Sequence, residues 1–152
     1  MGFFTKKTVI ITGAGRAVLS DGKCGSIGYG IATAFAKEGA NLVITGRNVQ
    51  KLTDAKEELE RLYGISVLPV QADVHAGADN AAVVKQVVEQ AVAAFGAIHV
   101  LINNAQASAS GVTLADHTTE QFDLAMYSGL YATFHYMPVS YTHLTLPTNS
   151  LV

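Results

Sequence analysis

A glycine-rich stretch near the N-terminus has the residue types that hold a phosphate group. Residues 12–16 read TGAGR and directly follow a short apolar run, and residues 26–32 read SIGYGIA and open an amphipathic segment. Glycines let a backbone turn tightly and approach phosphate oxygens, while the free N–H groups of a helix N-terminus favour an anion. The pattern is typical of a dinucleotide pyrophosphate site, and the alternative is a plain glycine-rich loop.

The type of dinucleotide is indicated at the end of a second apolar run, where Gly46, Arg47 and Asn48 follow one another. An NAD-selective site usually places a carboxylate here to accept a hydrogen bond from the ribose 2′-hydroxyl. A guanidinium instead pairs with a 2′-phosphate, and Arg16 in the glycine loop offers a second positive charge. We therefore predict NADP rather than NAD, the alternative being that Arg47 is a solvated surface charge.

Four apolar runs predict the strands that position these residues, at 8–12, 41–45, 66–72 and 99–103. Their apolar cores are continuous rather than alternating, as in a parallel sheet that is covered on both faces. Between them, apolar residues recur at helical spacing: Ile27, Ile31 and Phe35; Leu52, Ala55, Leu59 and Leu62; Val84, Val88, Ala91 and Phe95. Asn48 is the expected N-cap of the second helix, and Thr118 with Gln121 forms a capping box for a fourth helix ending near Met137.

Alternating strands and helices predict an α/β fold, a doubly wound Rossmann-type parallel sheet with strand order 3-2-1-4. Ligands bind such a sheet at the carboxyl ends of its strands, where the strand order reverses. The segments 12–15 and 103–106 should therefore flank one crevice.

Composition limits the remaining possibilities. A chain of 152 residues with 49% hydrophobic residues, 14% charged residues and a net charge of -2 fits one soluble domain, with no bias toward nucleic acid or membrane. It has one cysteine, Cys24, and no Cys/His spacing typical of a metal site. Its first seven residues fit neither a signal peptide nor a membrane span. We expect a cytoplasmic protein without a metal.

Three motifs resemble those of the short-chain dehydrogenase/reductase family: residues 12–28 its T-G-x-x-x-G-x-G turn, residues 103–106 its N-N-A-G motif, and Asp73-Val74 a third family position. The resemblance implies that Gly13, Ile27 and Gly28 line the pyrophosphate and ribose, that Asp73 and Val74 hold the adenine, and that Asn104 and Ala105 lie beside the cofactor. A capping role for Asp73 and a sheet-bracing amide at Asn103 are the open alternatives. The full predicted cofactor set is Thr12, Gly13, Gly15, Arg16, Ser26, Ile27, Gly28, Arg47, Asp73, Val74, Asn104 and Ala105.

The chain also departs from the family pattern. Gly13 and Gly28 are 15 positions apart, nine more than in the family signature, and Ser26 replaces the middle glycine. Residues 26–32 are similar to the wider turn of a divergent branch that contains enoyl-acyl-carrier-protein reductases. Gln106 replaces the last glycine of N-N-A-G.

The resemblance implies a catalytic set of Asn, Ser, Tyr and Lys, which this chain does not match. No tyrosine has a lysine four residues later, and Gly129 stands where the family has the helix-borne asparagine. We predict no catalytic residue in this chain. The family implies an NADP-dependent oxidoreductase acting on a carbonyl/alcohol pair, similar to a 3-oxoacyl reductase, with a small-molecule substrate and a homo-oligomeric parent protein. The alternatives are a non-catalytic dinucleotide sensor and an enoyl-acyl-carrier-protein reductase-like enzyme.

The last fifteen residues do not resemble the family. We predict a truncated Rossmann domain at 1–137 and a non-native tail at 138–152, with Pro138 interrupting the fourth helix. Residues 139–144 can be encoded by the terminal repeat of a transposon used to prepare sequencing libraries. The alternative is a genuine short strand at 141–146.

Overall fold

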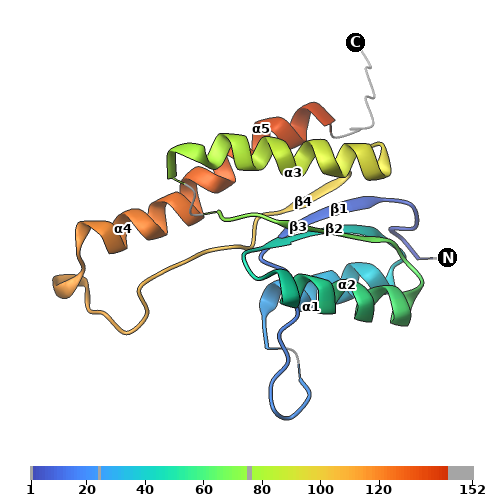
Figure 1. Ribbon diagram of the computed structural model, residues 1–152, viewed down its shortest axis with the longest axis horizontal. Helices are drawn as coiled ribbons and strands as arrows, with labels where there is room; N and C mark the ends of the chain where they lie inside the picture. Colours follow the sequence, from blue (N-terminus) through green and yellow to red (C-terminus); the bar gives the residue numbers. More distant parts are fainter. Residues whose placement is uncertain (1, 24, 75–76, 144–152) are drawn as a thin grey trace.

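A four-stranded parallel sheet forms the centre of the molecule (Figure 1). The structure is a computed structural model and describes residues 2–23, 25–74 and 77–143. The strands are β1 (Thr8–Thr12), β2 (Asn41–Gly46), β3 (Val67–Gln71) and β4 (Val100–Ile102). Their order is β3-β2-β1-β4, which confirms the predicted doubly wound topology. All four predicted strands are present, with ends shifted by at most one residue.

Helices cover both faces of the sheet (Figure 1). On one face, α1 (Ile27–Lys37) and α2 (Val49–Tyr63) pack on Val9, Ile11 and Ile44. On the other, α3 (Asn80–Phe95) and α5 (Ala132–His143) pack on Ile10 and Val43. Successive residues of one strand thus point into two different cores, which is why the strand sequences are apolar throughout. The remaining elements are two short 3₁₀ turns, η1 (Gly77–Asp79) and η2 (Leu114–Asp116), the helix α4 (Thr119–Ala125) and a π-helical segment, η3 (Met126–Tyr131).

The predicted stripe of α1 is confirmed in part, since Ile31 and Phe35 are partly buried and pack against the core, whereas Ile27 does not. Ile27 is 77% exposed, and the buried residues of the helix are Gly28, Tyr29, Ala32 and Ala36. The sheet-facing side therefore consists largely of small residues, which bring the helix axis close to the strands. In α2 and α3 the predicted residues are buried except Leu62, which is exposed, and Phe95, which is partly buried.

Two predicted helix caps are confirmed. The Asn48 side chain accepts a hydrogen bond from the Lys51 N–H at 2.9 Å. Thr118 Oγ1 accepts from the Gln121 N–H at 3.3 Å, and Gln121 Oε1 accepts from the Thr118 N–H at 3.1 Å. These bonds replace the partners that the first N–H groups of a helix lack.

The expected interruption at Pro138 is wrong. Helical structure runs without a break from α4 through a π-helical segment, η3 (Met126–Tyr131), into α5, and Pro138 lies inside α5. A proline removes one hydrogen bond from a helix, and α5 packs on α3 through residues that precede it, such as Tyr136. Residues 141–143 are helical rather than extended, while 144–146 lie outside the described residues. The origin of the segment 138–152 stays a prediction.

Candidate cofactor-binding site

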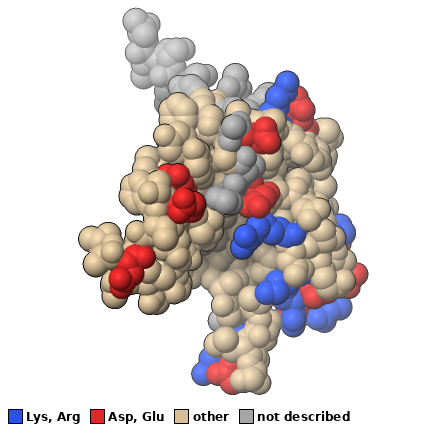
Figure 2. Space-filling view, turned by 60° about the vertical axis from the view of Figure 1, so that its left-hand side comes forward, with Lys and Arg blue, Asp and Glu red and all other residues tan. Residues whose placement is uncertain are grey.

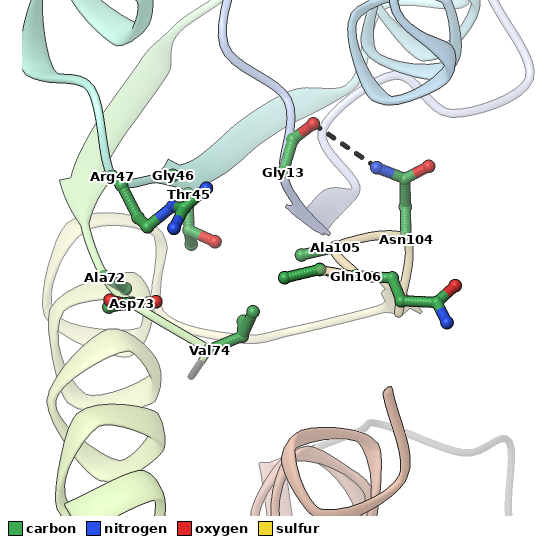
Figure 3. A pocket seen from close by; sticks show the side chains of 11 residues that line it. Gly13, Thr45, Gly46, Arg47, Ala72, Asp73, Val74, Asn104, Ala105 and Gln106 are labelled. Atoms are coloured by element: carbon green, nitrogen blue, oxygen red, sulfur yellow. Dashed lines mark hydrogen bonds between the residues drawn. The ribbon is translucent and has the colours of Figure 1, made fainter. Parts of the chain in front are cut away.

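A cleft opens at the carboxyl ends of the four strands (Figure 3). Its cavity has a volume of about 210 Å³. Four parts of the chain line the cleft, one at the carboxyl end of each strand: Gly13, 45–47, 72–74 and 104–107. The structure thus brings the turn after β1 and the segment after β4 together, as the strand order predicts.

Thr12 joins these two segments. Its buried hydroxyl accepts hydrogen bonds from the backbone N–H groups of Asn104 and Ala105, both at 2.9 Å, and donates to the carbonyl of Ile102 at 3.4 Å. Thr12 therefore acts through the backbone of the cleft wall, and its side chain is not exposed to a ligand.

Asn104 braces the same turn from the other side. Its Nδ2 donates to the carbonyls of Thr12 at 2.9 Å and Gly13 at 3.3 Å, the second of which is drawn in Figure 3. The bracing role considered for Asn103 thus belongs to Asn104, while Asn103 is exposed.

Two glycines are required where α1 meets this turn. Gly13 has φ +71°, and a Cβ there would lie 3.1 Å from Cα and Cβ of Ala105. A Cβ on Gly28 would lie 2.2 Å from the Gly13 carbonyl oxygen and 2.6 Å from Asn104 Nδ2, which backbone and side chain could not accommodate. The absence of both side chains lets the N-terminus of α1, capped by Ser26 through the Tyr29 N–H at 3.4 Å, begin directly behind the cleft.

Arg47, Asp73 and Val74 form the end of the cleft opposite Gln106 (Figure 3). Arg47 is exposed, and within the described part of the chain no ion pair involves its guanidinium. Its backbone is held by Gln71, whose Nε2 donates to the Arg47 carbonyl at 3.1 Å. This hydrogen bond holds the backbone of Arg47 beside the end of β2, so that its positive charge lies at the cleft.

Arg16 and Gly15 lie elsewhere. The Arg16 guanidinium forms an ion pair with Glu58, and its backbone N–H donates to the Lys51 carbonyl at 2.7 Å. A Cβ on Gly15 would lie 3.1 Å from Cβ of Lys51, so this glycine lets the loop lie on α2. The structure does not bring Arg16 together with Arg47, because the carboxylate of α2 holds it in a separate surface hollow.

The Arg16–Glu58 pair also includes the phenol of Tyr29. The hydrogen bond to Glu58 raises the pKa of Arg16. Burial opposes ionisation of Glu58, but the bonds from Arg16 and Tyr29 outweigh it and lower its pKa. Burial, and then Glu58, raise the pKa of Tyr29 to about 12. These three groups therefore anchor the glycine-rich loop to α1 and α2.

The described residues of the inserted part of the glycine-rich loop, 17–23 and 25, project from the body of the molecule as a hairpin (Figure 1). Leu19 N–H donates to the Lys23 carbonyl at 2.8 Å, and Gly25 N–H donates to the Ala17 carbonyl at 2.7 Å. Asp21 and Lys23 pair at its tip, 3.0 Å apart. Figure 2 shows basic and acidic side chains together at the end of a protrusion at the bottom of the view.

Sequence reasoning missed four residues that line the cleft: Thr45, Gly46, Ala72 and Ala107, whereas Gln106 belongs to the segment 103–106 that it placed at the crevice. Thr45, Gly46 and Ala72 lie at or directly after the carboxyl end of a strand, so the rule that placed the crevice could have found them. It also missed Ser128, whose hydroxyl accepts from the Ala107 N–H at 2.9 Å.

This fold and cleft define a Rossmann-type dinucleotide-binding unit, and comparison with known sequences gives its family. A sequence model described as enoyl-(acyl carrier protein) reductase matches residues 22–149. The chain belongs to the short-chain dehydrogenase/reductase family, a family of oxidoreductases. The predicted family is thereby confirmed.

Two relatives and two solved structures illustrate the likeness. The chain is 57% identical over 152 residues to the 12α-hydroxysteroid dehydrogenase of a Clostridium species, covering 100% of this chain and 56% of the relative. It is 36% identical over 126 residues to human hydroxysteroid dehydrogenase-like protein 2, covering 78% and 27%. The chain thus spans about half of the first relative's length and less of the second.

Among solved structures, L-sorbose reductase of Gluconobacter frateurii in complex with NADPH and L-sorbose superimposes with a TM-score of 0.79 and 28% identity, over 93% of this chain and 48% of that one. A short-chain dehydrogenase of Burkholderia cenocepacia in complex with NADP has a TM-score of 0.79 and 25% identity, over 93% and 52%. No helix in the described part of the chain is long and apolar enough to span a membrane.

Proposed function

We propose that the complete gene product containing this chain is an NADP-dependent dehydrogenase that interconverts a secondary hydroxyl group of a hydroxysteroid and the corresponding ketone. The observation that carries this proposal is the 57% identity, over every residue of the chain, to a 12α-hydroxysteroid dehydrogenase. A ring hydroxyl and its ketone are the kind of carbonyl/alcohol pair that the sequence motifs imply. The likeness supports hydroxysteroids, rather than the 3-oxoacyl compounds expected from the motifs, as the substrate class.

The residues of the cleft fit the cofactor. The missing Cβ atoms at Gly13 and Gly28 leave a backbone cradle at the start of α1, where the first N–H groups have no partner within the helix. Gly13, Ile27 and Gly28 would hold the pyrophosphate and ribose, and Asp73 and Val74 the adenine. Ile27, at the N-terminus of α1, is exposed in the structure, so a bound cofactor could cover its apolar side chain.

Arg47 would carry the preference for NADP. It lies on the cleft lining, at the strand end where a 2′-substituent of the adenosine ribose is recognised, and a guanidinium binds phosphate with two parallel hydrogen bonds. Arg16 could reach a phosphate only by giving up Glu58, so we assign it an anchoring role first. Two solved neighbours, the L-sorbose reductase and the Burkholderia enzyme, were determined with NADPH and NADP.

The contribution of these 152 residues is to bind and orient the cofactor. The nicotinamide ring supplies the hydride acceptor or donor when bound. A tyrosine that exchanges a proton near neutral pH needs a pKa brought down toward that pH, whereas burial raises the pKa of Tyr29 and of Tyr136 to about 12. Neither is therefore suited to transfer a proton.

The test is an assay of the complete gene product with NADP⁺ and a 12α-hydroxysteroid, followed by the absorbance of reduced nicotinamide. A steroid with its hydroxyl group at another ring position is the matched control, and extract from cells carrying the empty vector excludes host reductases. We expect turnover of the 12α-hydroxysteroid. Cofactor binding without turnover of any steroid would support a dinucleotide sensor instead.

A second candidate is an enoyl-acyl-carrier-protein reductase-like activity. It is favoured by the description of the matching family model and by the wide turn that ends in residues 26–32. Reduction of an enoyl thioester at a rate above that of 12-oxosteroid reduction would establish it. A cytoplasmic location and a homo-oligomeric state stay predictions.

A further inference from the structure

Two departures from the family motifs meet in space. A Cβ built on Gly129 would have three atoms of one side chain as its nearest neighbours: Nε2, Cγ and Cδ of Gln106, at 3.7, 3.8 and 3.9 Å. Gln106 stands where the family has glycine, and Gly129 stands where it has asparagine. The amide that the helix lacks is thus present on the facing segment, after β4.

The backbone of Gly129 does not itself require glycine, since Gly129 is not among the glycines with positive φ. A methyl group at this position would make ordinary van der Waals contact. A longer side chain pointing the same way would occupy the volume of the Gln106 amide. The absence of a side chain at residue 129 therefore leaves room for the Gln106 amide.

The segment that carries Gln106 is fixed on both sides. Before it, the Ala105 N–H donates to Thr12 Oγ1 at 2.9 Å. After it, the Ala107 N–H donates to Ser128 Oγ at 2.9 Å, and the buried Ser128 hydroxyl also reaches the Leu124 carbonyl at 2.8 Å. Because Ser128 directly precedes Gly129, its hydrogen bond to Ala107 also keeps Gln106 close to Gly129.

Gly129 itself lies in the π-helical segment η3. The Ala132 N–H reaches back to the Tyr127 carbonyl, and the same carbonyl accepts from Nδ2 of the buried Asn80 at 3.3 Å. The wide turn is thereby held against α3. Single π-helical turns inside helices occur frequently at functional sites.

Gln106 and Arg47 line the same cleft from its two ends (Figure 3). A dinucleotide whose 2′-phosphate lies at Arg47 extends its nicotinamide half away from that residue, toward Gln106. A primary amide offers both donors and an acceptor, so it can orient two polar partners at once. The carboxamide therefore stands at the end where the reacting groups meet.

We propose that Gln106 is a positioning residue of the reaction, and that its carboxamide, reaching toward Gly129 from the segment after β4, replaces the amide that other family members carry on the helix. Its N–H and C=O groups keep the polar groups at the nicotinamide end of the cleft in their reactive orientation. Gln106 and Gly129 form one coupled pair. The inference rests on the proposed dehydrogenase function.

The test uses steady-state kinetics of the complete gene product with NADPH and its steroid ketone. Gln106→Met keeps the side-chain volume and removes the groups that can form hydrogen bonds, and Gln106→Gly removes the side chain. We expect either variant to lower kcat by about 100-fold, the loss that a small misplacement of reacting groups causes. The KM for NADPH should change by less than about threefold, since its phosphate and pyrophosphate contacts are intact.

The matched pair of double variants separates the amide from mere space filling. Gln106→Gly with Gly129→Asn returns an amide from the helix and should recover kcat to within about tenfold of the unchanged protein. Gln106→Gly with Gly129→Ala fills space without an amide and should stay low. Equal recovery by the two double variants, or an unchanged kcat and pH profile in Gln106→Met, would overturn the role of Gln106.

The readouts keep this inference distinct from the function on which it rests. If the unchanged protein neither binds NADPH nor reduces a steroid ketone, the proposed function fails, and the role of Gln106 fails with it. If the unchanged protein does both and Gln106→Met is as active, only the role of Gln106 fails. Thermal melting of each variant shows that a lost kcat does not come from unfolding.

Discussion

Replacing Thr12 by valine should loosen the wall of the cleft without changing its shape. Valine has nearly the same volume but cannot accept the hydrogen bonds from the N–H groups of Asn104 and Ala105, both 2.9 Å long. The Thr12 side chain is 2% exposed, so solvent cannot replace the lost acceptor. The two donors would be left without their present partner.

The magnitude follows from the number of donors affected. An unsatisfied donor away from water costs about 1–3 kcal/mol, so two partly buried donors predict a loss of about 2–4 kcal/mol of unfolding free energy. Thr12→Ser is the matched control, because it keeps the hydroxyl and loses one methyl group, worth about 1 kcal/mol. The valine variant should therefore be the less stable of the two, although it is the more apolar.

Urea unfolding of the complete gene product measures the stability difference, and hydrogen exchange of the peptide containing residues 104 and 105 measures its location. We expect faster exchange at these amides in Thr12→Val and nearly unchanged exchange in Thr12→Ser. A valine variant that is as stable as the serine variant, with the same protection at 104 and 105, would refute the bracing role of Thr12.

Three further predictions follow from the anchoring pair, the motif content and the surface. Glu58→Gln should release Arg16 and lower the melting temperature at neutral pH. Because the pKa of Glu58 lies below its ordinary 4.5, the ion pair stabilises the fold fully above pH 4.5 and loses this effect as the pH falls through the lowered pKa. A difference in melting temperature between the two proteins that grows in acid would contradict the pair. The purified 152-residue chain should reduce no ketone with NADPH, and turnover above that of an empty-vector preparation would disprove this. The same chain should self-associate in size-exclusion chromatography, since in the described residues β4 pairs with β1 alone and Phe122, Leu130 and Phe134 are exposed. The double variant Leu130→Lys, Phe134→Lys should associate less. A sharp monomer peak of the unchanged chain at all concentrations would count against this prediction.

Most of the fold could be predicted because its signals are local. Continuous apolar runs such as Val9-Ile10-Ile11 mark strands that are buried on both faces, and the rule of right-handed crossovers then fixes their order. The caps at Asn48 and Thr118 depend only on residues three positions away. These features need no knowledge of tertiary packing.

The features that were missed depend on tertiary contacts. The most buried side of α1 consists of Gly28, which lies against the Gly13 turn, and of Tyr29, Ala32 and Ala36, which the positions of the larger apolar residues do not show. Pro138 lies inside α5, which packs on α3, and the π-helical turn is held by Asn80, which lies 47 residues before Tyr127 in the chain.

The residues of the site also fall into those that local signals predict and those that depend on tertiary contacts. Residues directly after strands, such as Gly13, Arg47 and Asp73, are brought to one cleft by the topology alone. Arg16 follows the same strand as Gly13 but pairs with Glu58, 42 residues later, on the surface of α2. The nine-residue insertion after Arg16 has no counterpart in the family signature, so the position of the loop could not be derived from the motif.

The most direct test of the central claim is a calorimetric titration of the complete gene product with NADPH and with NADH, repeated for Arg47→Asp. We expect the unchanged protein to bind NADPH more tightly than NADH, and the substitution to lower the ratio of the two affinities by about 10- to 100-fold, since a hydrogen bond to a charged group contributes about 1.5–3 kcal/mol. An unchanged ratio in Arg47→Asp, or no binding of either cofactor to the unchanged protein, would contradict the account.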